Sequence, residues 1–571
     1  MMLSRQNKRW VIHEPLPAAV DQELSNYPSF FRQILYARGA DTAQKALTYL
    51  EGQVENDDPF NILDMGATID RLLWAVDQHE SIVVYGDYDV DGVTATALLV
   101  EVLRRYGADV KPYIPSRFDE GYGLNLDAMQ ALAGQGVRVV VTVDCGIRSP
   151  REAELAEKCG VDLIISDHHH PGAELPEAYT VICPKREGDA YPDKDLSGVG
   201  LAYKIAQALE MRRPQAGVHA EDWLDLVALG TIADVVPLQG ENRSLVRRGL
   251  QMMRSKKLMN RPGLYSLANI SGLKIGQITS SDIGFGLGPR LNAAGRLNTA
   301  LDALNLLMAE STNEAGRLSQ DLDNQNRERQ ELTRRMQEDA ISHIQAGEDG
   351  DILFAFQKEY NPGVVGLVAS RLVDYFYRPA IVGQMDGEYT RASCRSIPEF
   401  HITKALDECG DLLERHGGHA LAAGFTVRND RVPELVSRLR QVAARELSAL
   451  NLRPVLYADL EVPLSELHPM ILGYLDKMQP TGQGNPEVLF VSRGLRVVKS
   501  KVVGAEGQHL KLTLTDGHIT YDAIAFRQGY RAEGLADHLD ILYLFEQNEY
   551  NGKVNLQLNI RDLKPAGAPD D

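Results

Sequence analysis

In three short stretches of this chain, a run of aliphatic residues is followed directly by acidic or imidazole side chains. They span residues 82–92, 139–146 and 163–170, and their polar groups are Asp87, Asp89, Asp91, Asp144, Asp167, His168, His169 and His170. Unbroken aliphatic runs of this length predict strands buried on both faces, as in parallel sheets. Such sheets bind ligands beyond the carboxyl ends of their strands. We therefore expect the five aspartates and as many as three histidines to converge on one site.

Such a cluster needs cations, because two unit charges about 4 Å apart repel by roughly 4 kcal/mol at an effective dielectric near 20. Carboxylates with one or two imidazoles suit Mn²⁺ or Mg²⁺, whereas Zn²⁺ usually takes more histidine or cysteine. The pattern therefore indicates a two-metal hydrolase, whose ions Asp144 could bridge. If the chain stays extended, Asp87, Asp89 and Asp91 line one side of it. The alternative for one of them is a helix cap, for which Asp91 is best placed.

A further acid, Asp234, lies in the almost wholly apolar stretch 226–237. A carboxylate in such surroundings must be paired, hydrogen-bonded or metal-bound, and we favour metal binding. The three consecutive histidines cannot all face one metal, so we expect at least one of them to be a supporting or loop residue.

The composition is that of a soluble globular protein of three or four domains, with 571 residues, 44% of them hydrophobic and 24% charged. No apolar run is long enough to span a membrane, and the first residues lack the apolar core of a secretion signal. The five scattered cysteines argue against a zinc knuckle or a disulfide framework and favour a reducing cytoplasm. The net charge of −19 does not indicate nucleic-acid binding, although a local basic groove would suffice for it.

Hydrophobic patterning divides the chain into five segments. We expect a helical lead-in over 1–65, an α/β domain with a parallel sheet over 66–305, a connecting helix over 306–348, a second, smaller α/β domain over 349–450 and an OB-like β-barrel over 454–563. Helices are predicted over 68–79, 93–106 and 151–158, and strands and helices should alternate to about residue 300. Residues 312–346 have the apolar spacing of one long helix, and the tail from Lys564 is expected to be disordered.

Two motifs of the second α/β domain suit phosphate binding. Gly417 and Gly418 precede His419 and a run of small residues, which predicts a glycine turn that starts a helix and admits a phosphate. A tight turn with a structural histidine is the alternative. Ser393 and Arg395 would share one face of a strand, and arginine suits bidentate phosphate contact. Elsewhere the candidates are Arg117 and one of Arg290 or Arg296, although a single arginine is more often a surface charge.

The expected barrel carries basic and aromatic side chains on or near its strands. They are Arg493, Arg496, Lys499, Lys501, Lys511, Phe490, Tyr521 and Phe526. OB folds track single strands with a basic groove and aromatic platforms, but basic residues on strands are also common on a solvated face. Tyr113, Phe118 and Tyr122 flank Arg117 and would either stack on bases or belong to the core.

Taken in order, four motifs resemble those of the DHH phosphoesterase superfamily: Asp87-x-Asp89-x-Asp91-Gly, Val-Asp144-x-Gly, Ser-Asp167-His168-His169 and Ala-Asp234. The length and the later segments are similar to its RecJ-type branch, the bacterial 5′→3′ exonucleases specific for single-stranded DNA, from about residue 70 to about residue 560. Asp87 stands where some superfamily members have histidine, which matches that branch.

The resemblance implies a site for two divalent cations, Mn²⁺ or Mg²⁺. Asp89 and Asp91 would hold the ions, Asp144 would bridge them, and His168 and Asp234 would complete the set. Three further residues would take part in catalysis: Asp87 and His169, which could also be metal ligands, and Asp167, which would support the histidines. The segment 391–396 resembles the phosphate pocket of the family, and Gly417-Gly418-His419 resembles its substrate-contacting element.

The resemblance also implies degradation of single-stranded DNA in the 5′→3′ direction to 5′-mononucleotides, in DNA repair and recombination, by a cytoplasmic monomer. A single-strand-binding protein and a recombination helicase would be its protein partners. Three alternatives are a phosphoesterase for short oligonucleotides or pyrophosphate, a haloacid-dehalogenase-like enzyme with Asp89 as nucleophile, and a scaffold that binds nucleic acid without cutting it. The terminal barrel argues against the phosphoesterase for small substrates. The histidine cluster argues against the haloacid-dehalogenase-like enzyme, and the complete set of expected metal ligands argues against the scaffold.

Overall fold

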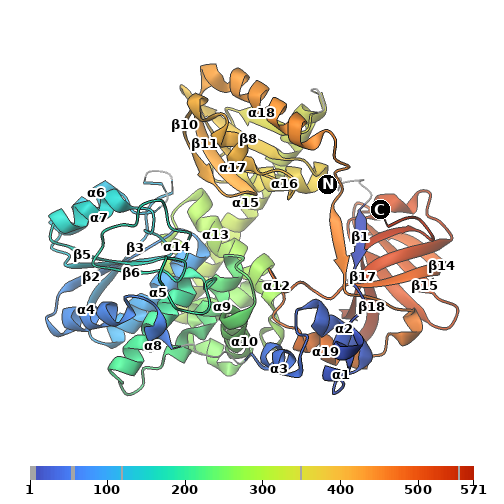
Figure 1. Ribbon diagram of the computed structural model, residues 1–571, viewed down its shortest axis with the longest axis horizontal. Coiled ribbons are helices and arrows are strands. Elements are labelled where there is room, and N and C mark those ends of the chain that lie inside the picture. The colour runs from blue at the N-terminus through green and yellow to red at the C-terminus, as the bar shows by residue number, and fades with distance from the viewer. Residues whose placement is uncertain are drawn as a thin grey trace. The chain divides into compact units, whose positions relative to one another are not determined.

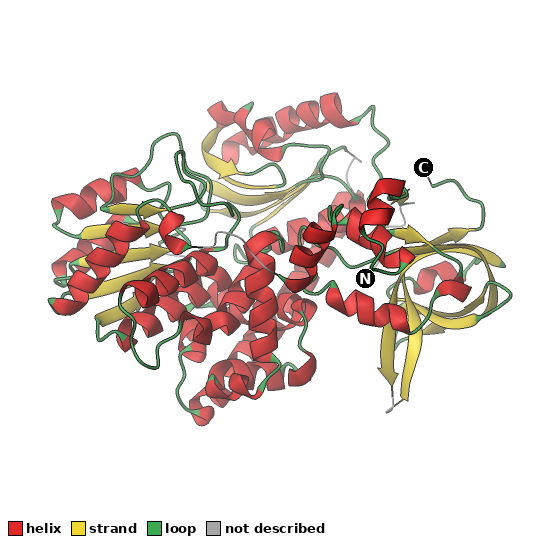
Figure 2. Ribbon diagram, turned by 60° about the horizontal axis from the view of Figure 1, so that its bottom comes forward, coloured by secondary structure: helices red, strands yellow, loops and turns green. Residues whose placement is uncertain are grey.

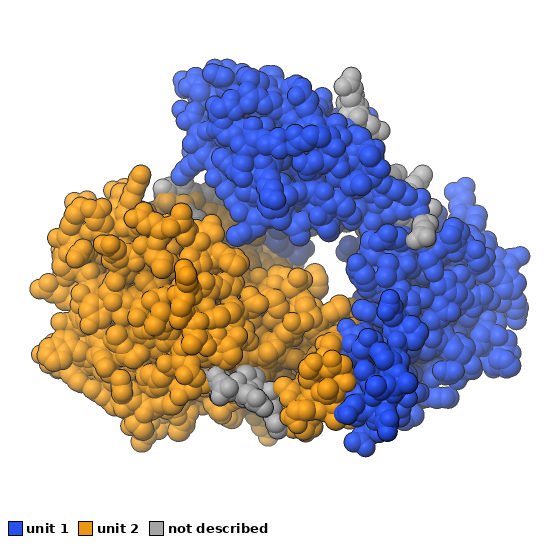
Figure 3. Space-filling model, viewed as in Figure 1, with its two compact units in different colours: residues 1–37, 328–475, 488–571 blue, residues 38–327, 476–487 orange. Residues whose placement is uncertain are grey.

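The computed structural model describes residues 8–52, 58–117, 120–121, 123–346, 350–550 and 553–570. The chain forms two compact units, which Figure 3 colours separately. Unit 1 contains residues 1–37, 328–475 and 488–571, and unit 2 contains residues 38–327 and 476–487. All the acidic and imidazole candidates for metal binding lie in unit 2.

Unit 2 is built on a five-stranded parallel sheet with the strand order β3-β2-β4-β5-β6 (Figure 1). The strands are β2 (Ser81–Gly86), β3 (Asp109–Tyr113), β4 (Val139–Val143), β5 (Asp162–Ser166) and β6 (Thr180–Ile182). Numbered along the chain within the sheet, this is the 2-1-3-4-5 order of doubly wound folds, in which the winding reverses between the first and third strands. The carboxyl ends of β2 and β4 therefore flank the point where such sheets bind ligands.

Successive side chains of the central strands enter two different cores, because a strand points them to opposite faces. Val84 and Val141 pack with the helices α5 and α8 on one face, while Val83 and Val140 pack with α6 and α7 on the other. The helices around the sheet are α4 (Met65–Asp77), α5 (Val90–Arg105), α6 (Leu126–Gly134), α7 (Pro150–Lys158) and α8 (Gly198–Arg212). The three helices predicted here from the sequence are confirmed, with their ends shifted by a few residues.

The rest of unit 2 is helical. Its elements are α9 (Leu224–Ala233), α10 (Gly240–Met253), α11 (Pro262–Ile270), α12 (Ser280–Asp282), the π-helical turn η5 (Ile283–Leu287), α13 (Gly288–Leu297), α14 (Leu301–Leu307) and the first part of α15 (Thr312–Ala346). The predicted strand and helix alternation is therefore wrong between Ile182 and residue 300. The long helix over 312–346 is confirmed: Leu322 packs into the core of unit 2, and Met336 packs into a core of unit 1.

The second α/β domain, in unit 1, has a mixed sheet with the order β10-β11-β9-β8-β7, of which only β7 and β8 are paired in parallel. Its strands are β7 (Leu353–Gln357), β8 (Ala380–Asp386), β9 (Tyr389–Arg395), β10 (Leu413–Gly418) and β11 (Ala422–Arg428). Its helices are α16 (Val365–Phe376), α17 (Ile402–Asp407) and α18 (Val432–Leu447).

The C-terminal part of unit 1 is a five-stranded barrel (Figure 2), as predicted. Its strands are β14 (Phe490–Val503), β15 (His509–Thr515), β16 (Thr520–Ala525), β17 (His538–Tyr550) and β18 (Lys553–Pro565). They pair in the order β14-β15-β16-β18-β17, and β17 pairs back with β14 to close the barrel. Tyr550 pairs with Lys553, so the predicted hairpin is present, although Asn551 and Gly552 themselves lie outside the described residues.

Both ends of the chain pack beside the barrel. The lead-in contains α1 (Ala18–Glu23), α2 (Ser29–Ala37) and α3 (Ala43–Glu51), but it begins with a strand that the sequence did not predict, β1 (Arg9–Ile12). β1 pairs with β12 (Val455–Ala458), which precedes β13 (Leu460–Glu461) and α19 (Met470–Lys477). The predicted disorder of the tail is wrong as far as Asp570, whose carboxylate binds Arg493 at 2.7 Å and Lys564 at 2.6 Å.

All five cysteines are unpaired, as the sequence predicted. Among the helices of the described residues, none combines the length and the apolar character that crossing a bilayer requires.

Close contact between α5 and α9 depends on Gly230. A Cβ at this position would lie 2.2 Å from Thr94 Oγ1, 2.8 Å from Val199 Cγ1 and 2.9 Å from Asp91 Oδ1. We expect Gly230→Ala to lower the free energy of unfolding by about 1–3 kcal/mol through overpacking. Gly134→Ala is the matched control, because a Cβ at Gly134 meets open space. Thermal unfolding measures both, and equal midpoints for the two variants would contradict this account of the helix contact.

Candidate metal centre

The three strand ends meet at one edge of the parallel sheet, as their order along the chain predicted. Three overlapping groups of side chains each bring their possible ligand atoms within 4.8 Å of one another. The groups are Asp87, Asp89 and Asp144; Asp144, His168 and His169; and Asp91, His168 and Asp234. Because Asp144 and His168 each belong to two groups, the cluster is continuous and could hold more than one cation.

The first motif does not remain extended, contrary to the expectation from the sequence. β2 ends at Gly86, and α5 begins at Val90, three residues earlier than predicted. The N-cap is Asp89 and not Asp91: Asp89 Oδ1 accepts from the amides of Asp91 at 2.9 Å and Gly92 at 3.1 Å. The turn is tight, since a Cβ at Gly92 would lie 2.5 Å from the carbonyl oxygen of Asp87.

Asp91 lies in the first turn of α5 and faces the start of another helix. Its carboxylate accepts from the amides of Gly198 at 2.7 Å and Val199 at 2.8 Å, at the N-terminus of α8. A helix N-terminus favours an anion, yet burial and the charge of Asp89 raise the pKa of Asp91 to about 7. The two α8 amides are not among the site groups predicted from the sequence, although Ser197 followed by small residues is a typical helix start.

Asp144 follows β4 and adopts a left-handed backbone conformation with φ of 64°. Its Oδ1 lies 3.1 Å from His168 Nε2, and Asp234 Oδ2, at the C-terminal end of α9, lies 3.5 Å from the same nitrogen. Among the described residues, Asp87 Oδ1, Asp144 Oδ1 and both ring nitrogens of His168 are buried without a hydrogen-bond partner. Buried polar atoms without partners are costly, so this donor set fits a bound divalent cation.

Two members of the histidine motif, Asp167 and His169, are hydrogen-bonded to each other. Asp167 accepts from the amide of Ile147 at 2.9 Å, from the amide of His169 at 3.1 Å and from His169 Nδ1 at 2.7 Å. Burial opposes ionisation of Asp167, but the bond to His169, its charge and the Ile147 amide outweigh burial and lower the pKa of Asp167. The same bond outweighs burial to raise the pKa of His169. His170 belongs to none of the three groups, and its carbonyl oxygen accepts from Arg148 at 2.8 Å.

The cluster carries more negative charge than the fold alone neutralises. Burial, followed by the charges of neighbouring aspartates, raises the pKa of Asp87 and of Asp144 well above the usual value and that of Asp234 to about 9. Burial and the charge of His169 lower the pKa of His168 to about 3, so this imidazole is neutral. The arrangement therefore consists of carboxylates and a neutral imidazole that all gain from a cation.

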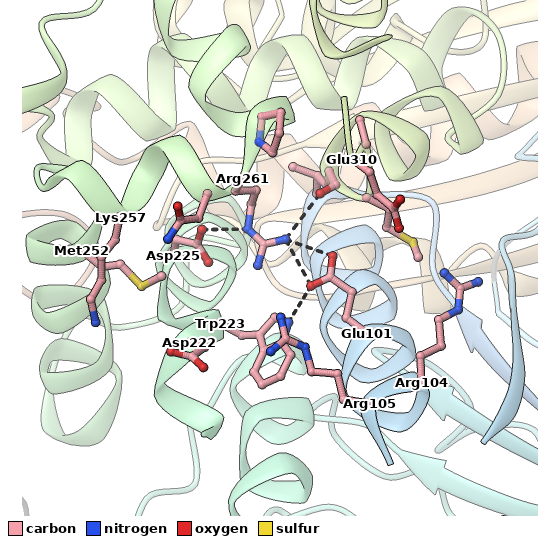
Figure 4. Close-up of a pocket in the computed structure, with 15 residues that line it drawn as sticks. Glu101, Arg104, Arg105, Asp222, Trp223, Asp225, Met252, Lys257, Arg261 and Glu310 are labelled. Carbon is pink, nitrogen blue, oxygen red and sulfur yellow. Dashed lines mark hydrogen bonds and ion pairs between the residues drawn. The ribbon is translucent and has the colours of Figure 1, made fainter. Parts of the chain in front are cut away.

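An ionic network at the far ends of α5 and α9 fixes these helices, which carry Asp91 and Asp234 at their near ends. Arg261 Nε donates to Asp225 on α9 at 2.7 Å, and its Nη1 donates to Glu101 on α5 at 3.1 Å (Figure 4). Trp223 Nε1 donates to Glu101 at 2.6 Å. These groups line a polar pocket of about 620 Å³, in which Arg261 pairs with Glu101 and Asp225.

The arginines predicted for phosphate binding in unit 2 differ in their surroundings. The guanidinium of Arg117 lies 4.1 Å from the centre of the Tyr88 ring, and its Nε is buried with no hydrogen-bond partner among the described residues. Burial raises the pKa of Tyr88 to about 12, against the charges of Arg117 and Arg296, so both act on this ring. Arg290 is instead held by Asp323 at 2.9 Å and by the carbonyl of Gly286 at 2.8 Å.

Of the aromatic residues near Arg117, Tyr113 follows the second of the two alternatives, a place in the core. The Tyr113 hydroxyl donates to Glu120 at 2.7 Å, and its ring stacks on that of the buried Tyr85 at 4.8 Å, so Tyr113 belongs to the packing of unit 2. Phe118 and Tyr122 lie outside the described residues.

In the second α/β domain, Ser393 and Arg395 share one face of β9, as predicted. A Cβ at Gly366, in the first turn of α16, would lie 3.2 Å from Arg395 Nη2 and 3.6 Å from Ser393 Oγ. The two side chains thus lie against a helix N-terminus, which is a suitable place for a phosphate. Burial lowers the pKa of Arg395.

The prediction that a helix follows Gly417 and Gly418 is wrong. Gly417 and Gly418 end β10, which pairs with β11 in a hairpin, and the amide of His419 donates to the carbonyl of Ala422 at 2.7 Å. A run of small residues suits a hairpin as well as a helix, and pairing of β11 with β9 decides the outcome.

The barrel residues named from the sequence divide into two sets. Phe490 and Tyr521 are buried in the barrel, and Arg493 forms ion pairs with Glu461, Asp540 and Asp570, so these three residues are structural. Lys511 pairs with Asp522 at 3.3 Å. The remaining members are exposed: Arg496, Lys499, Lys501 and Phe526.

Comparison with known proteins agrees with each part of the fold. Models of the DHH family N-terminal domain, the DHHA1 domain and the RecJ OB domain match residues 81–231, 349–445 and 458–562. The single-stranded-DNA-specific exonuclease RecJ of Bacillus subtilis (strain 168) is 38% identical over 562 residues, which are 97% of this chain and 70% of that protein.

Two solved structures extend the comparison to metals. The crystal structure of RecJ in complex with Mn²⁺ from Thermus thermophilus matches with a TM-score of 0.85 and 29% identity, over 98% of this chain and 80% of that one. The structure in complex with Mg²⁺ from the same organism matches with a TM-score of 0.79 and 28% identity, over 98% and 79%.

The raised pKa values give a prediction about metal binding and pH. Without a cation, Asp91 keeps its proton up to about pH 7 and Asp234 keeps its proton up to about pH 9. In the unfolded chain both carboxyl groups lose their protons near the ordinary pKa of 3.8. Stability of the metal-free protein should therefore fall as the pH rises through this window. Mn²⁺ should raise the unfolding midpoint, and the gain should grow with pH because the ion displaces protons.

Thermal unfolding in EDTA and in Mn²⁺, at several pH values between about 6 and about 9, measures this dependence. Asp234→Asn should reduce it, because the amide does not titrate. A gain from Mn²⁺ that stays constant across the pH range would contradict the prediction.

Proposed function

Because this chain belongs to the RecJ family of single-stranded-DNA-specific exonucleases, we propose that it hydrolyses single-stranded DNA in the 5′→3′ direction and releases 5′-mononucleotides. The observation that carries the proposal is the continuous cluster of carboxylates and imidazole at the switch point of a parallel sheet. A role in DNA repair and recombination, in the cytoplasm and as a monomer, is part of this proposal, as are a single-strand-binding protein and a recombination helicase as partners. The boundaries of the five predicted segments also stay proposals.

We infer that the cluster binds two divalent cations, Mn²⁺ or Mg²⁺. Asp89, Asp91, Asp144, His168 and Asp234 would hold them, with Asp144 between the two. When bound, such ions activate a water molecule and stabilise the attacking and leaving oxygens of the phosphodiester. The overlap of the groups at Asp144 and His168 supports two adjacent ions.

Three neighbouring residues would assist without being principal metal ligands. Asp167 orients His169 through Nδ1 and favours its protonated form, in which the imidazolium could donate to a phosphate oxygen. Asp87, buried with one oxygen free of hydrogen bonds among the described residues, faces the same cluster. The negative charge of Asp167 would favour the charged form of His169 through the reaction.

Each unit, taken by itself, contains candidate residues for phosphate recognition. In unit 2, the candidates are Arg117 and one of Arg290 or Arg296, of which Arg290 is held by Asp323 and by the carbonyl of Gly286. In unit 1, Ser393 and Arg395 lie at the N-terminus of α16. The hairpin residues Gly417, Gly418 and His419 would contact the strand through the backbone and the imidazole.

Digestion of strands labelled at the 5′ or the 3′ end, with Mn²⁺ or Mg²⁺ and beside duplex and RNA controls, tests the proposal. Wild-type protein should release labelled mononucleotide first from the 5′-labelled single strand. Early release of mononucleotide from the 3′ label would reverse the proposed polarity, and equal digestion of duplex would contradict the substrate.

Asp144→Asn should lower the cleavage rate at least about a hundredfold, because it removes a carboxylate shared by two groups of metal ligands. Asp127→Asn, at an exposed position in the first turn of α6, is the matched control and should cleave normally. Substantial Mn²⁺-dependent cleavage by Asp144→Asn would exclude the bridging role.

Arg395→Ala should reduce the preference for a 5′-phosphorylated strand over a 5′-hydroxyl strand by about tenfold, because one charge-assisted phosphate contact is lost. Arg440→Ala removes an exposed arginine from α18 in the same domain and should leave the preference intact. The ratio of kcat/KM for the two strands is the measurement, and an unchanged ratio for Arg395→Ala would assign the 5′ phosphate to other residues.

A further inference from the structure

Two conspicuously exposed apolar side chains lie together beside the candidate metal centre. Of the large apolar residues in the described part of the chain, Phe285 and Val235 are the most exposed, at 86% and 63%. Both line one pocket of about 360 Å³ in unit 2. Single exposed apolar residues are ordinary, but an apolar patch with a polar rim marks a binding site.

The backbone connects Val235 directly to the metal centre. Val235 follows Asp234, whose carboxylate lies 3.5 Å from His168 Nε2. Val235 has a φ of 63°, a left-handed conformation that a β-branched residue rarely adopts. The turn that directs Asp234 to the cluster thus holds Val235 in the neighbouring pocket, and such strain is concentrated at functional sites.

Phe285 is presented by the π-helical turn η5. The ends of this turn, Ile283 and Leu287, are fully buried, and a Cβ at Gly284 would lie 3.8 Å from Ile232 on α9. The carbonyl of Gly286 accepts from Arg290, which Asp323 holds in turn. Arg290 therefore fixes the turn that exposes Phe285, and π-helical turns are frequent at functional sites.

The chemistry of the pocket suits a flat, uncharged ring. Among the residues that the structure describes, its lining contains no lysine or arginine to pair with a phosphate. The walls are largely aliphatic, with hydroxyl and amide groups from Ser280, Ser281 and Gln483 among the polar atoms. Every nucleobase has a π face that can stack on an aromatic side chain, so such stacking does not depend on the sequence of the strand.

We propose that Phe285 and Val235 form a platform on which a base of the single strand stacks next to the scissile phosphate. This inference rests on the proposed function, because a strand whose phosphate lies at the metal cluster must place its neighbouring nucleotides along the adjoining surface. Phe285 is a positioning residue here, and the chemistry stays with the metal cluster. Stacking at this site holds the strand in register without selecting its sequence.

Kinetics on a single-stranded oligonucleotide test the platform. Phe285→Ala should raise KM about tenfold or more, through loss of one stacked base, with a much smaller change in kcat. Phe285→Trp should keep the wild-type KM, because indole also stacks. Trp74→Ala removes an aromatic side chain that is 58% exposed elsewhere in unit 2, and it should leave KM unchanged.

A binding measurement separates this inference from the nuclease proposal. In an Asp144→Asn background, a single abasic site is moved stepwise along the strand. Binding should weaken when the abasic site occupies one defined position, and adding Phe285→Ala should abolish this dependence. If wild-type protein bound strands in this way but cut none, the nuclease proposal would fail while the platform stood.

Two results would overturn the platform itself. One is a wild-type KM for Phe285→Ala together with an unchanged abasic profile. The other is that Phe285→Ala binds strands normally but loses binding to a purified single-strand-binding protein, which would make a protein the occupant of the pocket.

Discussion

Mutual repulsion among carboxylates is the constraint around which unit 2 is arranged. Asp87, Asp91, Asp144 and Asp234 are brought together although burial and each other's charge disfavour their ionised forms. The fold offsets part of this cost locally, through the α8 amides on Asp91 and the amides that Asp89 caps. What remains has to be offset by cations, so the affinity for metal and the instability of the empty site have the same origin.

The parallel sheet and the helices divide the task of holding the cluster. The strands set where Asp87, Asp144 and Asp167 emerge, because buried aliphatic strands fix both register and direction. Asp91 and Asp234 come from the ends of α5 and α9, whose opposite ends are joined through Arg261, Glu101 and Asp225. Helices and strands that are fixed at a distance from the reacting groups position ligands more accurately than loops do.

Much of this arrangement could be predicted from the sequence, because an aliphatic run followed by an acid is a local signal for a strand that ends at a site. Features that depend on contacts distant in the chain could not. Asp89 rather than Asp91 caps α5, since the α8 amides occupy Asp91. Gly417 and Gly418 enter a hairpin because β11 pairs with β9. Asp570 is ordered because Arg493 and Lys564 bind it. In each case a tertiary partner decides between local conformations of similar propensity.

The backbone of Asp144 restricts which amino acids evolution can place there. Its left-handed conformation is comfortable only for glycine, asparagine and aspartate, and of these only aspartate carries a charge for a cation. Asp144 also restricts its neighbour: a Cβ on Gly198 would come within 2.6 Å of Asp144 Cβ, so the start of α8 needs glycine there. Conformation and charge together therefore favour aspartate at this position over the other amino acids.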